Sequence, residues 1–107
     1  MARYDTVITN GTVVTPETRA DLDVAIADGK IAALGRPGDL DSADREIDAN
    51  GNFVMPGFVD AHVHVKIPLG EFTTLDNFEG VTRGAAFGGT TTVIDFAIPD
   101  PDESPLE

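Results

Sequence analysis

The chain has 107 residues, of which 41% are hydrophobic and 24% are charged, a composition that suits one ordinary globular domain. Nineteen acidic residues against seven basic ones give a net charge of −12, which excludes the basic surface that nucleic-acid backbones require. No apolar run reaches the roughly 20 residues of a membrane-spanning helix. The sequence contains no cysteine, so disulfides and thiolate metal ligands are excluded.

The N-terminal residues lack the apolar segment of a secretory signal, so we expect a cytoplasmic protein. Thirteen of the nineteen acidic residues are Asp, and only two residues are Lys. Short carboxylates with few lysines are typical of proteins adapted to high salt, where the repulsion between carboxylates is screened. An ordinary acidic bacterial protein is the alternative, and the sequence leaves both interpretations open.

The first fifty residues have the pattern of short strands joined by tight turns. Residues 4–9 are β-prone, and Asn10-Gly11 favours the positive φ angles of a two-residue hairpin before a second strand at 12–15. Apolar residues alternate with polar or small ones over residues 21–26, which predicts a half-buried strand with Asp23 on its outer face. Further strands and turns are expected at residues 31–34 and 46–49, and at Asp28-Gly29 and Asn50-Gly51. We therefore predict a small all-β layer built from hairpins.

The second half of the chain has a different pattern. Residues 53–65 are nearly continuously apolar, which is typical of a strand buried on both faces of a parallel sheet. The apolar residues between 73 and 88 have helical spacing, with Thr73 or Thr74 as the N-cap and a glycine pair at the end. Residues 90–98 predict a second buried strand. Strand, helix and strand in about forty residues indicate a βαβ unit with parallel strands.

His62 and His64 are the only histidines, and a single residue separates them within the first predicted strand of this unit. Side chains at i and i+2 of a strand point to the same side, with Cβ atoms ~6.6 Å apart. From that spacing two imidazoles can converge on one cation at ~2.0 Å from each nitrogen. The alternative is a pair of core imidazoles bonded to backbone carbonyls, which a His-x-His pattern alone does not exclude.

The segment around these histidines resembles the motif that opens the first barrel strand in cyclic amidohydrolases of the hydantoinase and dihydropyrimidinase family. The resemblance is carried by residues 54–64, in which Met55-Pro56-Gly57-Phe58-Val59-Asp60 precedes the histidine pair. Residues 82–96 are similar to the helix and second strand of the same enzymes. Three N-terminal stretches are similar to their β-layer, namely residues 4–15, 28–31 and 48–51.

The resemblance implies an α/β fold in two parts. Residues 1–53 would form an N-terminal β-sandwich layer of hairpins, and residues 54–99 the first β-α-β unit of an incomplete (β/α)8 TIM-like barrel, with the active site at its C-terminal mouth. Residues 100–107 would be an acidic, proline-rich tail or the truncation point. His62 and His64 would be metal ligands that hold the more buried of two divalent metals, usually zinc.

The implied activity is hydrolysis of a C–N bond other than a peptide bond in a cyclic amide, such as a hydantoin or a dihydropyrimidine. In the family a metal-activated hydroxide attacks the amide carbonyl, and an aspartate moves the proton to the departing nitrogen. That aspartate, a bridging carboxylated lysine and two further histidines come from later strands, so we expect no catalytic residue in this chain and no activity from it alone. The family also implies a homo-oligomer, commonly a tetramer, with a small cyclic amide as substrate. The net charge and the absence of a long apolar run indicate that neither nucleic acid nor a membrane is a partner.

Other residues near the histidines have two interpretations each. Asp60 is expected on their side of the strand, either orienting a metal ligand indirectly or bonded to backbone as a structural carboxylate. Leu69 and Phe72 belong to a segment that lines the substrate pocket in the family, or they only pack locally. Lys66 lies by alternation on the same side as the histidines, and its effect on substrate choice is open. Asp95 either reaches the site from the second strand or is structural.

Two other functions fit parts of the pattern. Some relatives of dihydropyrimidinase are non-catalytic assembly modules that lack the metal ligands, and the retained histidine pair speaks against that interpretation. Dihydroorotases and allantoinases share the opening motif, although residues 76–80 and 94–96 are more similar to the hydantoinase branch. An incomplete barrel would also leave open strand edges, which favour self-association.

Overall fold

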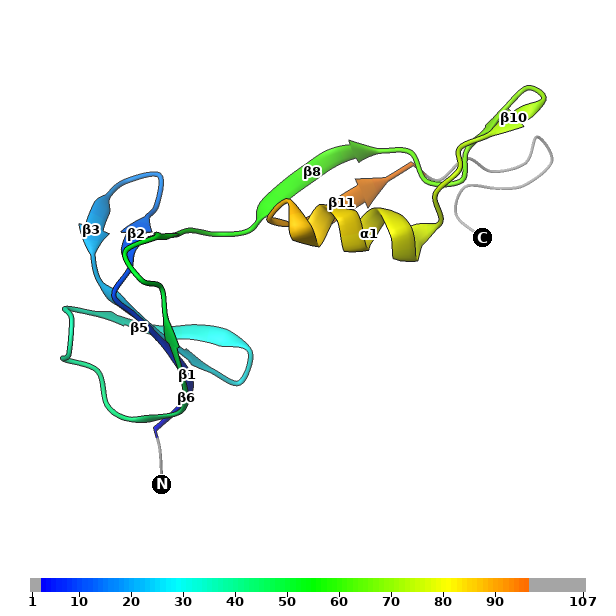
Figure 1. Cartoon of the computed structure of the whole chain (residues 1–107). Coiled ribbons are helices and arrows are strands. Elements are labelled where there is room, and N and C mark those ends of the chain that lie inside the picture. Colours follow the sequence, from blue (N-terminus) through cyan, green and yellow to red (C-terminus); the bar gives the residue numbers. More distant parts are fainter. Residues whose placement is uncertain (1–2, 97–107) are drawn as a thin grey trace. The chain divides into compact units, whose positions relative to one another are not determined.

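The computed structural model describes residues 3–96, which form eleven strands and one helix (Figure 1). The chain divides into two compact units, with the division between Pro56 and Gly57. No helix among the described residues has the length and apolar character needed to cross a membrane. The expected tail at 100–107 and the last residues of the strand expected at 90–98 lie outside the described part of the chain.

The first unit consists of two small β-sheets. Its strands are β1 (Tyr4–Thr9), β2 (Thr12–Val14), β3 (Arg19–Asp21), β4 (Asp23–Ala27), β5 (Lys30–Gly35), β6 (Ala43–Asp48) and β7 (Phe53–Val54). The four-stranded sheet has the order β5-β4-β1-β6, in which only β1 and β6 are parallel. The three-stranded sheet has the order β3-β2-β7, in which β2 and β7 are parallel. The prediction of an all-β layer is therefore confirmed.

The Asn10-Gly11 turn does not form the expected hairpin, because β1 and β2 belong to different sheets. Asn10 has a φ of 55° but Gly11 has no positive φ, whereas the type I′ turn typical of Asn-Gly has positive φ at both residues. Gly11 is required for space, since a Cβ there would lie 2.5 Å from a methyl carbon of Val54. Asn50-Gly51 connects the same two sheets, and the Gly51 N–H donates to the Asn10 carbonyl at 2.8 Å. The Asn10-Gly11 and Asn50-Gly51 segments thus lie side by side, and each connects one sheet to the other.

The hairpin expected at Asp28-Gly29 is present. Asp28 and Gly29 have φ values of 52° and 70°, and Ala27 pairs with Lys30 across the turn. The carboxylate of Asp5 accepts a hydrogen bond from the Asp28 N–H at 2.7 Å, which ties this turn to β1. The return strand predicted at residues 31–34 lies within β5.

The core of the first unit is small, and it contains a carboxylate that the sequence pattern placed outside. Tyr4, Val7 and Ala25 form the buried cluster. Asp23 is only 3% exposed, so the expectation that it faces water is wrong. The reason is that the segment between β5 and β6 reaches β4, where the Gly38 N–H donates to the Asp23 Oδ2 at 2.8 Å.

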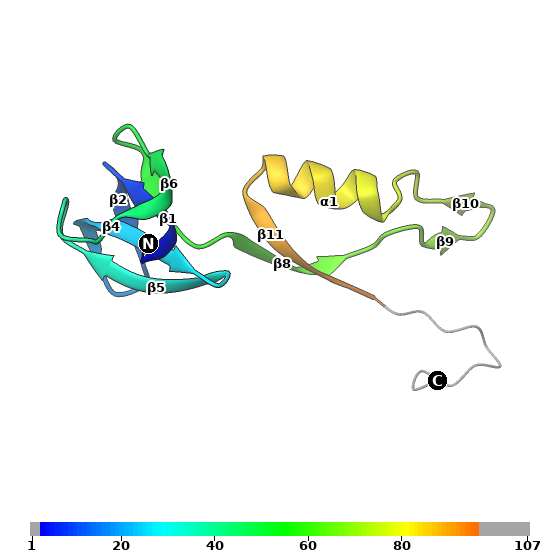
Figure 2. The same cartoon turned by 90° about the horizontal axis from the view of Figure 1, so that it is seen from below.

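The second unit has a strand–helix–strand arrangement with a short hairpin inserted before the helix (Figure 2). Its elements are β8 (Phe58–Val63), β9 (Pro68–Leu69), β10 (Phe72–Thr73), α1 (Phe78–Phe87) and β11 (Thr90–Asp95). β8 and β11 are parallel, as expected of a βαβ unit, and α1 runs alongside them in both views (Figures 1 and 2). β9 and β10 pair in antiparallel fashion around Gly70, whose φ is 64°.

The predicted helix is present, but it starts later than expected. Its N-cap is Asn77, whose side chain accepts a hydrogen bond from the Gly80 N–H at 2.9 Å, and not Thr73 or Thr74. Thr73 lies in β10 instead. The Thr74 hydroxyl accepts a hydrogen bond from the Ile67 N–H at 2.9 Å, and the Thr74 N–H donates to the Ile67 carbonyl at 3.1 Å. These two bonds close the base of the β9–β10 hairpin.

The expectation that the histidine-bearing strand is buried on both faces is wrong for the described residues. Five of the six residues of β8 are exposed, and only Val63 is half-buried. The physical reason is that β8 has a single paired neighbour, β11, within residues 3–96. The apolar side chains of β8 are therefore only partly covered by the other described residues.

Candidate metal centre

The histidine pair lies at the carboxyl end of β8. His62 is within the strand and His64 is one residue beyond its end. The Nε2 atoms of the two exposed imidazoles are 3.1 Å apart. The ring centroids are 4.9 Å apart, and the ring planes are nearly perpendicular at 89°. The expectation that both side chains project to the same side of the backbone is confirmed.

This geometry fits two ligands of one cation. With zinc at ~2.05 Å from each nitrogen, a separation of 3.1 Å corresponds to an N–metal–N angle of roughly 100°, close to tetrahedral. The same separation fits a hydrogen bond from a ring that carries a proton on Nε2 to a ring that does not. Residues 3–96 contain no group of three or more acidic, histidine or cysteine side chains that could hold a metal. The geometry of the pair is thus compatible with two ligands of a tetrahedral site, and residues 3–96 contribute no third ligand to it.

Phe96 packs against both imidazoles, and the sequence reasoning missed it. Its ring centroid is 4.8 Å from that of His62 and 4.8 Å from that of His64, with interplanar angles of 46° and 44°. The pairing of Asp95 with Val63 brings the end of β11 beside the histidines. Only the register of these two parallel strands could have indicated this contact, because nothing in the spacing along the chain distinguishes Phe96.

Two carboxylates bond to the main chain around the histidines. The Asp60 Oδ1 accepts a hydrogen bond from the His62 N–H at 3.2 Å. The Asp95 Oδ1 accepts hydrogen bonds from the N–H groups of Val65 at 3.2 Å and Phe96 at 2.9 Å. Both carboxylates thus stabilise the backbone that carries the imidazoles. For Asp60 this is the geometry of a structural carboxylate, and for Asp95 the contact bridges the two strand ends.

The remaining candidates lie after β8. Lys66 does not follow the strand alternation that was expected to place it beside His64, because β8 ends at Val63 and Lys66 has a left-handed φ of 53°. Phe72 lies in β10 and is 77% exposed. Leu69 lies in β9, but its side chain is outside the described part of the structure. The assignment of Leu69 and Phe72 to a substrate pocket stays a prediction.

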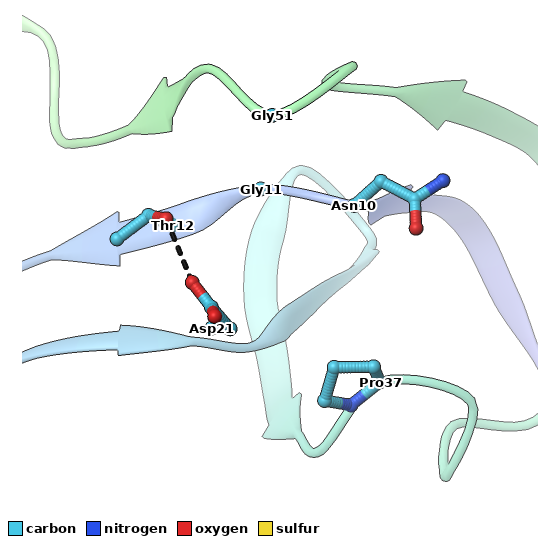
Figure 3. A pocket seen from close by; sticks show the side chains of 6 residues that line it. All are labelled: Asn10, Gly11, Thr12, Asp21, Pro37 and Gly51. Carbon is cyan, nitrogen blue, oxygen red and sulfur yellow. Dashed lines mark hydrogen bonds between the residues drawn. The ribbon is translucent and has the colours of Figure 1, made fainter.

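A hollow in the first unit offers no comparable chemistry. It has a volume of about 430 Å³ and is lined by Asn10, Gly11, Thr12, Asp21, Pro37 and Gly51 (Figure 3). Its one carboxylate, Asp21, accepts a hydrogen bond from the Thr12 hydroxyl at 2.7 Å, drawn as the dashed line (Figure 3). No histidine or lysine lines this hollow. It therefore lacks metal-binding nitrogens, and its carboxylate is already bonded to Thr12.

Residues 45–102 match the sequence model of the amidohydrolase family, and this range includes the histidine pair and the whole strand–helix–strand arrangement. The chain belongs to the amidohydrolase family. It is 48% identical over 97 residues to the D-hydantoinase of Geobacillus stearothermophilus, covering 90% of this chain and 20% of that relative. It is 40% identical over 104 residues to the dihydropyrimidinase of Rattus norvegicus, covering 94% of this chain and 20% of that relative.

A solved structure of a D-hydantoinase is similar to this chain, with a TM-score of 0.87 and 42% sequence identity over 95% of this chain and 22% of that chain. An allantoinase of Bacillus licheniformis is 43% identical over 98 residues, or 89% of this chain and 21% of that relative. The chain thus spans about a fifth of the length of the relatives it matches. The resemblance to hydantoinases and dihydropyrimidinases, predicted from residues 54–64, is confirmed.

Proposed function

We propose that this chain is the N-terminal part of a metal-dependent hydrolase that opens cyclic amides of the hydantoin and dihydropyrimidine class. The separation of 3.1 Å between the Nε2 atoms of His62 and His64 is the observation that carries the proposal. It supports metal binding because a shared cation requires two converging nitrogens. The identity of 48% to a D-hydantoinase supports the substrate class.

In the proposed enzyme His62 and His64 are ligands of one of two divalent cations, which we propose to be zinc. Each ring binds through Nε2, so Nδ1 carries the ring proton. A cation bound there would polarise the amide carbonyl and lower the pKa of a water molecule. In this proposal the residues of this chain bind the cation and orient it toward the substrate. Groups outside this chain transfer the protons.

The proposed architecture assigns residues 54–99 to the start of a (β/α)8 barrel and residues 1–53 to a β-sandwich. Parallel pairing of β8 and β11 supports the first assignment, since barrel strands are parallel and their active site lies at the carboxyl ends of the strands. The histidine pair is at that end of β8. Leu69 and Phe72 would contact the cyclic substrate. We also propose that the enzyme is cytoplasmic and homo-oligomeric.

Allantoinase activity is the second candidate, and the 43% identity to an allantoinase favours it. Allantoin carries the same hydantoin ring with an added ureido group, so the two activities require the same ring-opening chemistry. They differ in which substituent the pocket accepts. A comparison of hydantoin, dihydrouracil and allantoin as substrates separates them.

The test uses the full-length natural polypeptide that carries this chain, loaded with zinc. Ring opening is followed by loss of ultraviolet absorbance for the three cyclic amides. We expect turnover of hydantoin or dihydrouracil and its loss to background in the double variant His62→Ala/His64→Ala. The control variant is Lys30→Ala, which removes an exposed side chain of the first unit. It shows whether expression and purification of a variant alone reduce activity. Full activity of the double variant would contradict the proposal.

A further inference from the structure

The end of β11 makes two contacts with the histidine segment that the proposed function leaves unassigned. Phe96 places its ring at the same centroid distance, 4.8 Å, from both imidazoles. The angles of 46° and 44° show that it is tilted almost equally against the two rings. One aromatic side chain therefore contacts both members of the pair.

Asp95 makes the second contact, at a point where strand pairing ends. The last paired residue of β8 is Val63, opposite Asp95, so the ladder no longer holds the chain at His64. One residue later the Val65 N–H donates to the Asp95 Oδ1 at 3.2 Å. The same oxygen accepts from the Phe96 N–H at 2.9 Å. A single carboxylate oxygen thus links the residue after His64 to the residue that packs on both rings.

The two imidazoles have few other contacts that would hold them in place. Both imidazoles are exposed, so few other contacts restrict their rotation. Lys66, two residues after His64, has a left-handed φ of 53° and turns the chain away from the extended path. Ordering two free side chains costs conformational entropy, and a site that holds them in place before the cation arrives avoids that cost.

We propose that Asp95 and Phe96 are positioning residues that hold His62 and His64 in the arrangement required to share one cation. The inference rests on the proposed metal-binding function of the pair. Phe96 restricts the two rings, and Asp95 fixes the backbone after His64 relative to Phe96. Removal of either contact lets the Nε2 atoms separate, so the affinity for the cation falls while the fold persists.

The test measures zinc affinity of the full-length natural polypeptide by competition with a chromophoric chelator. Phe96→Leu is expected to weaken zinc binding at the His62/His64 site roughly tenfold, the lower end of the effect of residues that orient metal ligands. Phe96→Tyr keeps the aromatic face and is expected to stay within about twofold of the unmodified protein. Phe87→Leu is the matched control, because it removes an aromatic ring from a residue that is 87% exposed.

Asp95 is tested in the same way. Asp95→Ala removes the acceptor for both N–H groups and is expected to weaken zinc binding roughly tenfold. Asp95→Asn keeps one oxygen that can accept them and is expected to restore most of the affinity. The visible spectrum of the cobalt-substituted protein provides a second readout, since a changed ligand arrangement shifts its bands. Melting of the metal-free protein shows whether the fold is retained.

The outcomes separate this inference from the proposed function. If Phe96→Leu and Asp95→Ala bind zinc as tightly as Phe87→Leu while His62→Ala does not, Asp95 and Phe96 are not positioning residues. If His62→Ala and His64→Ala also leave zinc binding unchanged, the proposed function itself fails. If Phe96→Leu melts below the control, Phe96→Met replaces it. Met has no aromatic face, and its flexible, unbranched chain fills irregular space, so the same two outcomes decide.

Discussion

The Nε2 atoms of His62 and His64 converge to 3.1 Å although only His62 lies within a paired strand. Strand alternation therefore accounts for the side of the backbone on which the rings lie, but not for their separation. The separation depends on contacts that reach His64 from the neighbouring strand. This distinction determines which substitutions should affect the metal and which should affect only the fold.

Either histidine alone should be insufficient to retain the shared cation. We expect His62→Ala and His64→Ala each to lose it, and the double variant to lose no more than either single variant, because residues that act as one unit are not additive. Zinc content per chain after dialysis measures this. Two independent losses that add up in the double variant would show that the imidazoles bind separate ions.

The buried carboxylate of Asp23 should stabilise the first unit. Asp23→Ala leaves the Gly38 N–H without its acceptor, and we expect a loss of about 1–3 kcal/mol in the free energy of unfolding. Asp23→Asn retains an acceptor oxygen and should lose less. Urea unfolding measures the difference, with the exposed Asp44→Ala as control. Equal stability of Asp23→Ala and the control would show that the buried hydrogen bond contributes nothing.

Glycine at position 11 should be needed for space. In Gly11→Ala the new methyl group meets Val54 at 2.5 Å and Ala49 at 3.1 Å, and overpacking of this kind costs about 1–3 kcal/mol. Gly84→Ala is the opposite case, because nothing lies within 4 Å of its Cβ position and the residue is helical. We expect it to stabilise the protein by roughly 0.5–1 kcal/mol. Thermal unfolding of both variants tests these two expectations. A Gly11→Ala variant as stable as the unmodified protein would show that the contacts with Val54 and Ala49 do not exclude a methyl group.

Acid should reduce the stability of the segments that connect the two sheets of the first unit. The N–H of Asn50 and the side-chain amide of Asn10 both donate to Asp48 and hold the pKa of its carboxyl below the ordinary value. Because the folded-state pKa is the lower one, the charged form contributes stability above the unfolded pKa, and this is lost as pH falls through the folded value.

The corresponding experiment follows the melting temperature from neutral pH to below about pH 4, the ordinary range of an aspartate. Asp48→Asn should melt lower at neutral pH, with the difference shrinking as the pH falls. Asp44→Asn, another exposed residue of β6, is the control. A difference that does not change with pH would show that the hydrogen bonds to Asp48 do not favour its charged form.

Salt should stabilise the chain if its acidic composition reflects adaptation to high salt. The net charge is −12, and the described residues contain one ion pair, the exposed Arg3–Asp41 at 2.7 Å. Raising salt to about 1 M shortens the screening length to roughly 3 Å, so the repulsion between carboxylates falls. We expect a higher melting temperature in molar salt than in dilute buffer. An unchanged melting temperature would favour the ordinary acidic protein.

Sequence patterns correctly predicted the features that depend only on residues close together in the chain. Asp28-Gly29 formed its hairpin because the two strands it joins also pair with each other, and the histidines share a side because they are two residues apart. Asn10-Gly11 failed as a hairpin because β1 pairs with β6, whose partner residues lie 39 positions further along the chain. Asp23 was placed wrongly for a similar reason, since a loop that closes over β4 is not visible in the alternation of β4 itself.

For the candidate metal centre, too, the sequence predicted the local features and missed those that depend on distant residues. The residue types and spacing of His62 and His64 could be read from the sequence, and so could the relationship to amidohydrolases. The contacts of Phe96 and Asp95 could not, because they depend on the register of β8 against β11. Strand alternation does not extend to Lys66 because β8 ends at Val63 and Lys66 itself has a left-handed φ of 53°, a change that its residue type does not indicate.

The β9–β10 hairpin is closed at its base by the two hydrogen bonds between Ile67 and Thr74. Insertions or deletions between these residues can therefore occur without disturbing the imidazoles, which are anchored from the other strand. The length and sequence of this hairpin could therefore differ between related proteins while the spacing of the two imidazole nitrogens stays the same.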